Sequence, residues 1–528
     1  MNRRLLCLVV ALLAEVLFLT PSTPAAASTS PPTPETVEAP VTAIRIVPEP
    51  SSLVVLPGQS FTLRSPARIV APGGAAATGE YLAGLLRPST GFGLPVTTDA
   101  PQPGDIVLAV GNEASLGAEG YQLTVTEPTV ELSAHTTAGL FYGVQTLRQL
   151  LPPRMEYRSV QSGPWRVRGV AVRDIPRYPW RGAMLDVARH FFTVAQVEDF
   201  LDDISMYKIN TLHLHLSDNE GWRLEINGWP RLAHYGGSTD GSRGPGGFYT
   251  QDDYRAIVQY AATRHVTIIP EIDTPAHSTA ALASYAELNC DGVAPPLLDP
   301  GPRTLCVPLD ITYKYLDDVI AQVAALTPGE YIHVGGDEAS NSPAEYAFFM
   351  DKMQQIVLSH GKKLDGWLQI ETADLTSTAA TQYWAVRGSA DSEALARIAA
   401  QRGNKLIMSS PDHAYLDMKY DPSTPVGQAW AGYVSVSGSY DWDPATFVPG
   451  VADAVVGVEA PMWTDLIASY DYVQFMVFPR LAGIAEVGWS PESTHSWDDY
   501  RLRLAAQGPR WDALGVNYFR SPEVPWPA

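Results

Sequence analysis

The sequence predicts an α/β fold in which a (β/α)8 barrel follows a smaller α+β domain. From about residue 171 onward, eight short apolar runs typical of buried strands alternate with helical patterns. Before that point, short β-rich runs are accompanied by two helical stretches. Polar and aromatic residues also gather at the ends of seven of the eight later runs, where barrel enzymes carry their chemistry.

Residues 1–27 have the pattern of a secretory signal peptide. Two arginines precede an apolar run over residues 5–19, and three alanines at 25–27 suit cleavage. Glu15 interrupts the apolar run and makes it a poor permanent membrane anchor. Residues 28–40, rich in Pro, Ser and Thr, predict a flexible or extended linker. We therefore expect a secreted, extracellular protein with no permanent membrane span.

Residues 41–170 predict the smaller α+β domain. Helical patterns cover residues 81–86 and 138–151, the second with apolar residues three and four apart. Strands are expected at five β-rich runs, namely 44–48, 51–56, 105–110, 121–126 and 129–134.

Residues 171–528 predict the barrel and a short C-terminal tail. Its eight strands are expected at 182–188, 210–217, 266–273, 331–337, 364–371, 381–386, 405–410 and 455–463. Helical patterns follow several of them, at 194–208, 252–265, 313–326 and 344–359. The connection between the fifth and sixth strands is too short for a full helix. The connection between the seventh and eighth is long, aromatic and rich in Gly and Pro, which is typical of an active-site loop.

The composition limits the partners of the chain. Its 528 residues include 36 Lys plus Arg against 57 Asp plus Glu, a formal net charge of −21. This balance disfavours a nucleic acid or an anionic membrane surface and is compatible with a neutral or cationic ligand. Of the three cysteines, Cys7 lies in the predicted signal peptide. Cys290 and Cys306 are then an even pair in an exported chain and are expected to form a disulfide, two separate buried thiols being the alternative.

The candidate functional residues lie at the predicted strand ends. They are Arg189, Asp218, Asp273 with His277, Asp337 with Glu338, Trp367, Trp384, and Trp463 with Asp465. Each could have a separate structural task, but seven strand ends with such residues favour a common site.

Asp337 and Glu338 are adjacent, which is unusual for two catalytic acids. Glycosidases that use a nucleophile or a water need carboxyl groups about 5–5.5 Å or about 6.5–9.5 Å apart across the sugar. Neighbouring residues at one strand end fit poorly. They fit better if the substrate supplies its own nucleophile, a 2-acetamido carbonyl oxygen. Glu338 then protonates the leaving oxygen, while Asp337 holds the acetamido N–H as positive charge grows on an oxazolinium ring.

Seven motifs make the chain resemble glycoside hydrolase family 20, and in particular the secreted bacterial β-N-acetylhexosaminidases of that family. They are RGAMLDVARHFF (181–192), HLHLSDNEGWRLEI (213–226), PEIDTPAH (270–277), HVGGDE (333–338), YLDMKY (415–420), GVEAPMWTD (457–465) and FPRLAGIAEVGWSP (478–491). Residues 41–155, including AGLFYGVQTLRQLL, resemble the family's N-terminal domain. The resemblance covers nearly all of the mature chain. It implies exo-acting, retaining hydrolysis without a cofactor, on oligosaccharides that contain N-acetylhexosamine, such as chitooligosaccharides.

The resemblance also implies catalytic roles. Glu338 would be the general acid/base and Asp337 the residue that orients the acetamido group. Tyr415 would donate a hydrogen bond to the attacking acetamido oxygen. Asp218 and His277 would form a chain to Glu338 that tunes the pKa and position of the acid.

Sugar-binding residues follow from the same resemblance. Arg189 would hold the hydroxyls on C3 and C4 of the terminal sugar, because a planar fork of donors suits paired oxygens. Asp417 would bind a ring hydroxyl. The aromatic walls around the acetamido methyl and the sugar face would be Trp367, Trp384 and Trp463, with Trp430 nearer the leaving group.

Asp465 departs from the family pattern, which usually has Glu two residues after the last tryptophan. That Glu binds the outer hydroxyls of the sugar. With one methylene less, the contact becomes longer or water-bridged. Recognition of the C4 and C6 hydroxyls, and with it the choice between gluco and galacto substrates, therefore stays open.

Two other classes of function are compatible with parts of the sequence. His213 and His215 share a strand face and could bind a metal with Asp218, as in barrel amidohydrolases. The fifth and sixth strands offer Glu371 and two tryptophans but no histidine, which disfavours a metal site. A non-catalytic glycan-binding barrel is the third possibility, although the chain retains both acids and Tyr415. His333 is expected to be structural.

Overall fold

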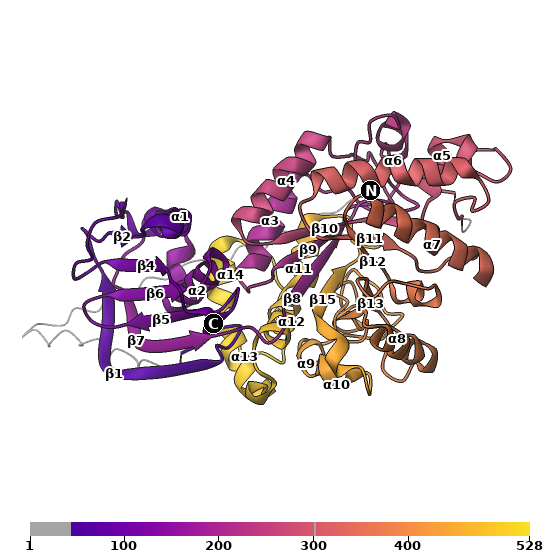
Figure 1. Ribbon diagram of the computed structural model, residues 1–528. Coiled ribbons are helices and arrows are strands. Elements are labelled where there is room, and N and C mark those ends of the chain that lie inside the picture. Colours follow the sequence, from indigo (N-terminus) through magenta and orange to yellow (C-terminus); the bar gives the residue numbers. More distant parts are fainter. Residues whose placement is uncertain (1–43, 300–302, 528) are drawn as a thin grey trace, which may run out of the picture. The chain divides into compact units, whose positions relative to one another are not determined.

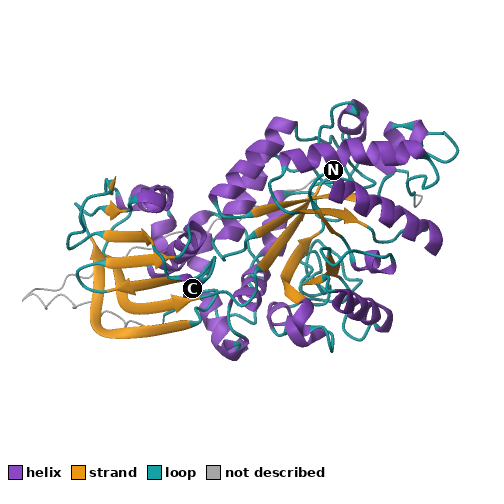
Figure 2. Cartoon of the chain, viewed as in Figure 1, coloured by secondary structure: helices purple, strands orange, loops and turns teal. Residues whose placement is uncertain are grey.

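The computed structural model describes residues 44–299 and 303–527. The predicted signal peptide and linker lie outside these residues. The strands form two sheets, which are shown with the surrounding helices in Figures 1 and 2. Within the described residues, no helix combines the length and the apolar composition that are needed to cross a bilayer.

The first domain contains a seven-stranded sheet in the order β1-β7-β5-β6-β4-β2-β3. Its strands are β1 (Ser52–Leu63), β2 (Ile69–Val70), β3 (Val96–Thr97), β4 (Ile106–Val110), β5 (Tyr121–Val125), β6 (Val130–Ala134) and β7 (Trp165–Asp174). The ladders that join β1, β7, β5 and β6 are antiparallel, and the others are parallel. Helices α1 (Ala76–Thr90) and α2 (Thr137–Leu150) and the short helices η1 (Gly73–Ala75), η2 (Ala114–Leu116) and η3 (Pro153–Glu156) complete this region.

Two expectations for the first domain were wrong. The run 44–48 is not a strand, because the N–H and C=O of Val47 bond to the side chain of Gln149 (2.9 and 2.6 Å) and not to a neighbouring strand. The interior strand β7, next to the edge strand β1, was missed. Its apolar alternation slips by one residue at Gly169, opposite the register shift in β1. A Cβ at Gly169 would lie 2.4 Å from the Cβ of Gln59, so the slip needs glycine.

The second sheet is the predicted barrel of eight parallel strands. They are β8 (Trp180–Asp186), β9 (Thr211–His215), β10 (Thr267–Thr274), β11 (Tyr331–Gly335), β12 (Lys363–Asp365), β13 (Ala380–Tyr383), β14 (Lys405–Met408) and β15 (Val455–Met462). β8 pairs with both β9 and β15, which joins the first strand to the last. A single bridge between Trp367 and Gln382 connects β12 to β13, so the barrel is nearly closed.

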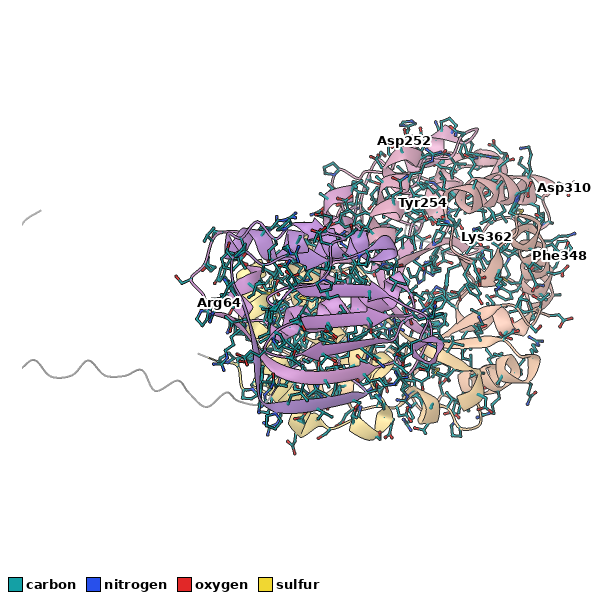
Figure 3. The ribbon with its side chains drawn as sticks, turned by 60° about the vertical axis from the view of Figure 1, so that its left-hand side comes forward. Arg64, Asp252, Tyr254, Asp310, Phe348 and Lys362 are labelled. Carbon is teal, nitrogen blue, oxygen red and sulfur yellow. A yellow bond between two sulfur atoms is a disulfide. The ribbon has the colours of Figure 1, made fainter. Side chains whose placement is uncertain are left out.

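Most helices of the barrel region cover the outside of the strands (Figure 1). The longer ones are α3 (Val194–Ser205), α4 (Gln251–Thr263), α6 (Asp310–Leu326), α7 (Pro343–Ser359), α8 (Ala390–Arg402), α11 (Tyr470–Val477), α12 (Arg480–Trp489), α13 (Trp497–Ala505) and α14 (Gly508–Leu514). The side chains of Asp310 and Phe348 mark the outer surface of α6 and α7 in Figure 3. The short helices are α5 (Thr279–Ser284), η4 (Leu232–Gly236), η5 (Ala286–Leu288) and η8 (Glu492–Thr494).

Both irregular connections were predicted correctly. Between β12 and β13 lies only the short helix η6 (Leu368–Thr372), although the predicted fifth strand was too long and ends at Asp365. Between β14 and β15 the chain forms a long loop with only α9 (Val436–Tyr440), α10 (Pro444–Phe447) and η7 (Ala452–Ala454). Cys290 and Cys306 form the expected disulfide, which closes the segment before α6.

Candidate active site

The turn after β11 explains why the two acids can be adjacent. Gly335 and Gly336 have φ of +71° and +99°, a region that favours glycine. A Cβ at Gly335 would lie 1.6 Å from the Oδ1 of Asp273, so the backbone approaches its neighbour more closely than any side chain allows. Glu338 has a φ of +48°, strain of a kind found at functional sites. Both Asp337 and Glu338 line one cavity as a result.

This cavity, about 170 Å³ in volume, contains ten of the twelve residues predicted to act in the site. It is lined by Arg189, Asp273, His277, Asp337, Glu338, Trp384, Tyr415, Asp417, Gln428, Trp430, Trp463 and Asp465. The other two predicted residues, Asp218 and Trp367, are buried and contact lining residues. The residues therefore come together as the sequence predicts.

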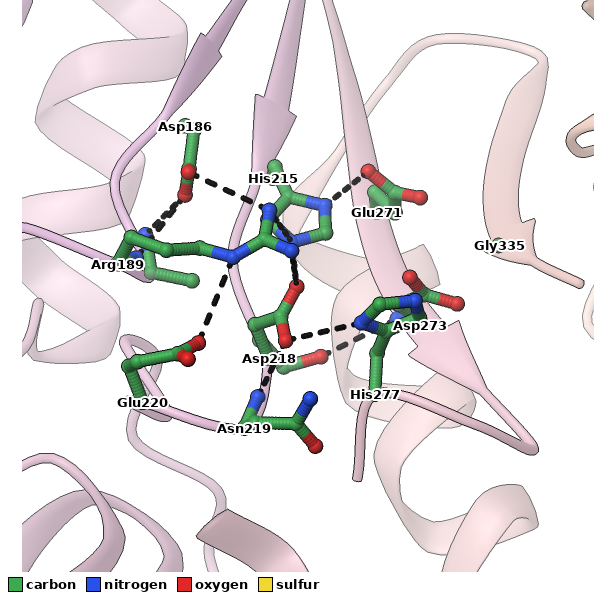
Figure 4. Close-up of polar contacts among 12 residues, drawn as sticks. Asp186, Arg189, His215, Asp218, Asn219, Glu220, Glu271, Asp273, His277 and Gly335 are labelled. Atoms are coloured by element: carbon green, nitrogen blue, oxygen red, sulfur yellow. Dashed lines mark hydrogen bonds and ion pairs between the residues drawn. The ribbon is translucent and has the colours of Figure 1, made fainter. Parts of the chain in front are cut away.

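Asp218, His277 and Glu338 form the expected chain. Asp218 Oδ1 lies 3.1 Å from His277 Nδ1, and Glu338 Oε2 lies 3.3 Å from His277 Nε2. Asp337 Oδ2 is 3.8 Å from the same nitrogen. Figure 4 shows the first of these links beside Arg189 and Asp273. Although burial opposes charge on the imidazole, Asp218, Asp273 and Asp337 raise the pKa of His277 far above its ordinary value.

The two adjacent acids have opposite pKa shifts. Interaction with the His277 imidazole holds the pKa of Glu338 below its ordinary value, while its side chain is 63% exposed. Burial raises the pKa of Asp337, despite the nearby His277, and its side chain is only 12% exposed. The environments of the two carboxyl groups therefore differ.

Arg189 is held by carboxylates at the ends of β8 and β9. Its Nη2 lies 2.7 Å from Asp218 Oδ2, and its Nη1 lies 3.4 Å from Asp186 Oδ2. Asp186 also accepts the backbone N–H of Arg189 and that of Thr464, which follows β15 (both 3.0 Å). The guanidinium carbon lies 4.8 Å from the ring centroid of Trp463. These contacts fix the position of the Arg189 guanidinium.

Aromatic side chains form one wall of the cavity. The indole of Trp384 contacts both Trp430 and Trp367, with centroid separations of 6.5 and 6.4 Å. Trp430 is 57% exposed and lies at the open side. Trp367 lies one layer further in, packed against Trp463 at 5.5 Å, with its N–H donated to Glu271 (3.0 Å). Trp367 thus supports the wall and is not among the lining residues.

The long loop after β14 supplies Tyr415 and Asp417. Both are buried, at 3% and 2% exposure. Burial and the neighbouring Asp417 raise the pKa of Tyr415 well above its ordinary value, so its hydroxyl keeps its proton. Burial and Asp465 raise the pKa of Asp417. Asp465 is more open, with a side chain that is 41% exposed.

Buried polar atoms without a hydrogen-bond partner converge on this cavity. Asp337 Oδ1 and Asp417 Oδ1 are of this kind. A buried acceptor that is left unpaired costs about 1–3 kcal/mol, so such atoms usually await a ligand or water. A ligand with several hydroxyl and amide groups can donate to these acceptors.

The histidines of the metal hypothesis are engaged by carboxylates. His213 Nδ1 and Nε2 bond to Glu459 (2.8 Å) and Glu271 (2.9 Å), and His215 bonds to Glu271 and Asp218. Although burial opposes charge, Glu271 and Glu459 raise the pKa of His213 to about 10. An imidazolium has no lone pair for a metal. Among the described residues, three groups have suitable spacing, His213–Glu271–His333, His215–Asp218–Asp273 and Asp273–His277–Asp337. In the first two, both ring nitrogens of His213 and of His215 already bond to carboxylates.

Sequence reasoning left two lining residues out of the predicted site. Asp273 was noticed at its strand end and expected, with His277, to tune the acid or to form a strand-end hydrogen bond; burial and Asp337 raise its pKa well above the ordinary value, which favours the neutral acid. Gln428 was missed entirely. Its backbone bonds to Asp417 and Lys419 (both 2.8 Å) and bring it to the cavity, and a lone glutamine in a long loop offers no sequence signal.

An eight-stranded barrel with paired acids, an imidazole chain and indole walls at the strand ends defines a glycoside hydrolase. The chain belongs to glycosyl hydrolase family 20: the model of the family's catalytic domain matches residues 178–492, and that of its domain 2 matches residues 43–175. A β-N-acetylhexosaminidase of Cellulomonas fimi is 37% identical over 492 residues, which cover 92% of this chain and 97% of that one.

Solved structures agree in fold. The family 20 β-N-acetylhexosaminidase of Streptomyces coelicolor A3(2) is 51% identical with a TM-score of 0.89, covering 92% of this chain and 99% of that chain. A mutant Streptomyces plicatus β-hexosaminidase in complex with its product GlcNAc is also 51% identical, with a TM-score of 0.89 over 92% and 98% of the two chains.

Proposed function

We propose that the protein is an exo-acting β-N-acetylhexosaminidase that removes terminal N-acetylglucosamine, with N-acetylgalactosamine as the second candidate substrate. The observation that carries this proposal is the pair Asp337 and Glu338 on one side of a small cavity, joined to Asp218 through His277. We propose chitooligosaccharides as substrates and a secreted bacterial enzyme. The signal-like N-terminus and the secretion-compatible disulfide support export.

In the first step, Glu338 gives its proton to the glycosidic oxygen, and the C1–O bond breaks. The acetamido carbonyl oxygen of the same sugar forms a new bond to C1, which yields an oxazolinium ion. Asp337 accepts the acetamido N–H and balances the positive charge, and Tyr415 donates to the attacking oxygen. In the second step Glu338 takes a proton from water, which attacks C1 and opens the ring. Two inversions at C1 give net retention.

The remaining residues hold the sugar. Arg189 faces the C3 and C4 hydroxyls, and Asp417 accepts from a ring hydroxyl. The indoles of Trp384 and Trp463 cover the acetamido methyl and the apolar sugar face, with Trp367 behind them. Trp430, at the open side, lies near the leaving group.

Hydrolysis of a chromogenic N-acetylglucosaminide tests the proposed function and should be insensitive to EDTA. None of the proposed steps uses a metal, so the rate after incubation with excess chelator should match that of untreated enzyme. Restoration of a lost rate by a divalent cation would favour the amidohydrolase alternative. Binding of chitooligosaccharides without turnover would favour the glycan-binding alternative.

Asp465→Glu should change the preference between gluco and galacto substrates. The longer side chain restores reach to the outer hydroxyls, and a gained direct hydrogen bond contributes about 0.5–1.5 kcal/mol. We expect KM for the gluco substrate to fall by roughly two- to tenfold, with a smaller change for the galacto substrate. Equal changes in the two KM values would contradict a role of residue 465 in recognising C4.

A further inference from the structure

A carboxylate outside the predicted site approaches the sugar-binding arginine. Glu220 lies in the loop after β9, two residues beyond Asp218. Its Oε2 is 3.4 Å from Nε of Arg189, whereas Asp465 Oδ1 is 4.0 Å from the same nitrogen. Figure 4 shows Glu220 and Asp218 contacting different edges of the guanidinium. Nη2 of Arg189 already pairs with Asp218 at 2.7 Å, so the guanidinium edge that carries Nε is the one available to Glu220.

Both atoms of this contact lack a hydrogen-bond partner. Arg189 Nε and Glu220 Oε2 are each buried and unpaired. Charge-assisted N–H···O bonds are usually about 2.7–2.9 Å long, so the 3.4 Å contact is open by about half an ångström. Hydrogen bonds of a site are often long before the ligand binds and shorten in the complex. Arg189 Nε and Glu220 Oε2 lie close together without forming a hydrogen bond, which indicates that this contact shortens when the ligand binds.

We infer that Glu220 is a positioning residue for Arg189: its carboxylate closes on the Nε edge as the sugar binds and holds the guanidinium plane toward the C3 and C4 hydroxyls. Asp465, one methylene shorter than the usual Glu, lies too far from Nε to do this. The inference rests on the proposed function, because it assumes that Arg189 binds the terminal sugar.

The loop around Gly241 lies beside Glu220. The N–H of Gly241 donates to the carbonyl of Arg189 (2.7 Å), which ties this loop to the arginine backbone. A Cβ at Gly241 would lie only 3.5 Å from Cγ of Glu220 and 3.7 Å from the His190 ring. The side chain of Glu220 is 31% exposed, so it has room to move by the small distance needed.

The charges that face Glu220 make its pairing sensitive to pH. Arg189 and Asp186 face it from the β8 loop, Asp218 from its own loop, and Asp465 from the β15 loop. The His190 ring, near Gly241, is bonded to Thr464 O (2.7 Å) and Ser242 Oγ (2.8 Å). Burial and the repulsion of Asp218, partly offset by Arg189, raise the pKa of Glu220 to about 7. The carboxylate is thus ionised and able to pair above this pH, and neutral below it.

The test compares KM for a chromogenic N-acetylglucosaminide in wild type and Glu220→Gln across pH. The ratio of the variant KM to the wild-type KM should be near one at about pH 5.5, where both side chains are neutral, and roughly three- to tenfold at about pH 8. The change in kcat should be less than about twofold. Glu225→Gln is the matched control, because Glu225 lies on the same segment but bonds to the Gln251 backbone (3.4 Å). Its KM ratio should stay near one throughout.

A compensating variant separates positioning from a purely structural role. Glu220→Ala alone should keep the raised KM. In Glu220→Ala/Asp465→Glu, the longer carboxylate at 465 can reach Nε of Arg189 as well as the outer hydroxyls, so Asp465→Glu should lower KM by a larger factor in the Glu220→Ala background than in wild type. A KM ratio that is flat with pH, or an equal effect of Asp465→Glu in both backgrounds, overturns the inference. Melting temperatures of all variants show whether folding alone explains a loss. Absence of wild-type hydrolysis would instead refute the proposed function.

Discussion

Glu338→Gln is expected to lower kcat by about 10²–10⁴-fold for chitobiose, whose departing sugar oxygen needs a proton. The amide has the same shape as the acid but cannot give that proton. For an aryl glycoside with a good leaving group, bond breaking needs little protonation, so the first step should be far less affected. The measurement is kcat and kcat/KM for both substrates in wild type and variant. Near-normal chitobiose hydrolysis by the variant would show that another residue is the acid.

The melting temperature of Glu338→Gln is the control that shows whether the variant is folded. The side chain of Glu338 is 63% exposed and contacts His277 Nε2 at 3.3 Å, an interaction that contributes little at such exposure. The melting temperature should therefore change by no more than a few degrees. A large fall would mean that lost activity reflects unfolding.

The lowered pKa of Glu338 describes the protein without a sugar. Interaction with His277 favours the carboxylate while water still reaches it. A bound sugar excludes that water, and desolvation raises the pKa of a carboxyl group. Binding should therefore favour the protonated form that the first step needs. Because Glu338 is exposed and Asp337 is buried, a bound substrate can change the pKa of Glu338 and leave the pKa of Asp337 unchanged.

The barrel and its site could be predicted because their signals are local. Seven of the eight predicted strands end in a short polar or aromatic segment, and barrel topology brings all such segments to one face. The two acids were placed correctly at the end of the fourth strand, although that strand was expected at 331–337 and ends at Gly335. The disulfide followed from two remaining cysteines and an exported chain.

The missed features depend on contacts between segments distant in sequence. Strand β7 was missed because its alternation of apolar and polar residues shifts by one at Gly169. The reason for the shift is the register change in the neighbouring strand β1, which the sequence of β7 does not contain. Glu220 has no local signal, because its approach to Arg189 requires two barrel loops and the Gly241 segment to meet. Trp367 was placed in the wall from the family resemblance, but its depth behind Trp463 depends on packing.

Asp337→Asn is expected to lower kcat by about 10²–10³-fold for every acetamido substrate, whatever its leaving group. The oxazolinium ion carries a positive charge in both steps of the reaction. Asp337 faces it from a buried position, 12% exposed, where a carboxylate interacts strongly. Asparagine keeps the size and one acceptor but removes the charge. Parallel losses for chitobiose and an aryl N-acetylglucosaminide, in contrast to the selective loss in Glu338→Gln, are the expected result.

The expected stability of Asp337→Asn distinguishes a loss of catalysis from a loss of folding. Burial raises the pKa of Asp337, which means that the fold disfavours its charge, and Asp337 in turn helps to raise the pKa of Asp273. Removing that charge should leave the melting temperature unchanged or higher. A more stable but nearly inactive variant would show that the protein retains a destabilising carboxylate for its reaction. An unchanged rate with an activated substrate would instead mean that the acetamido group needs no anionic partner, and the oxazolinium route would lose its main support.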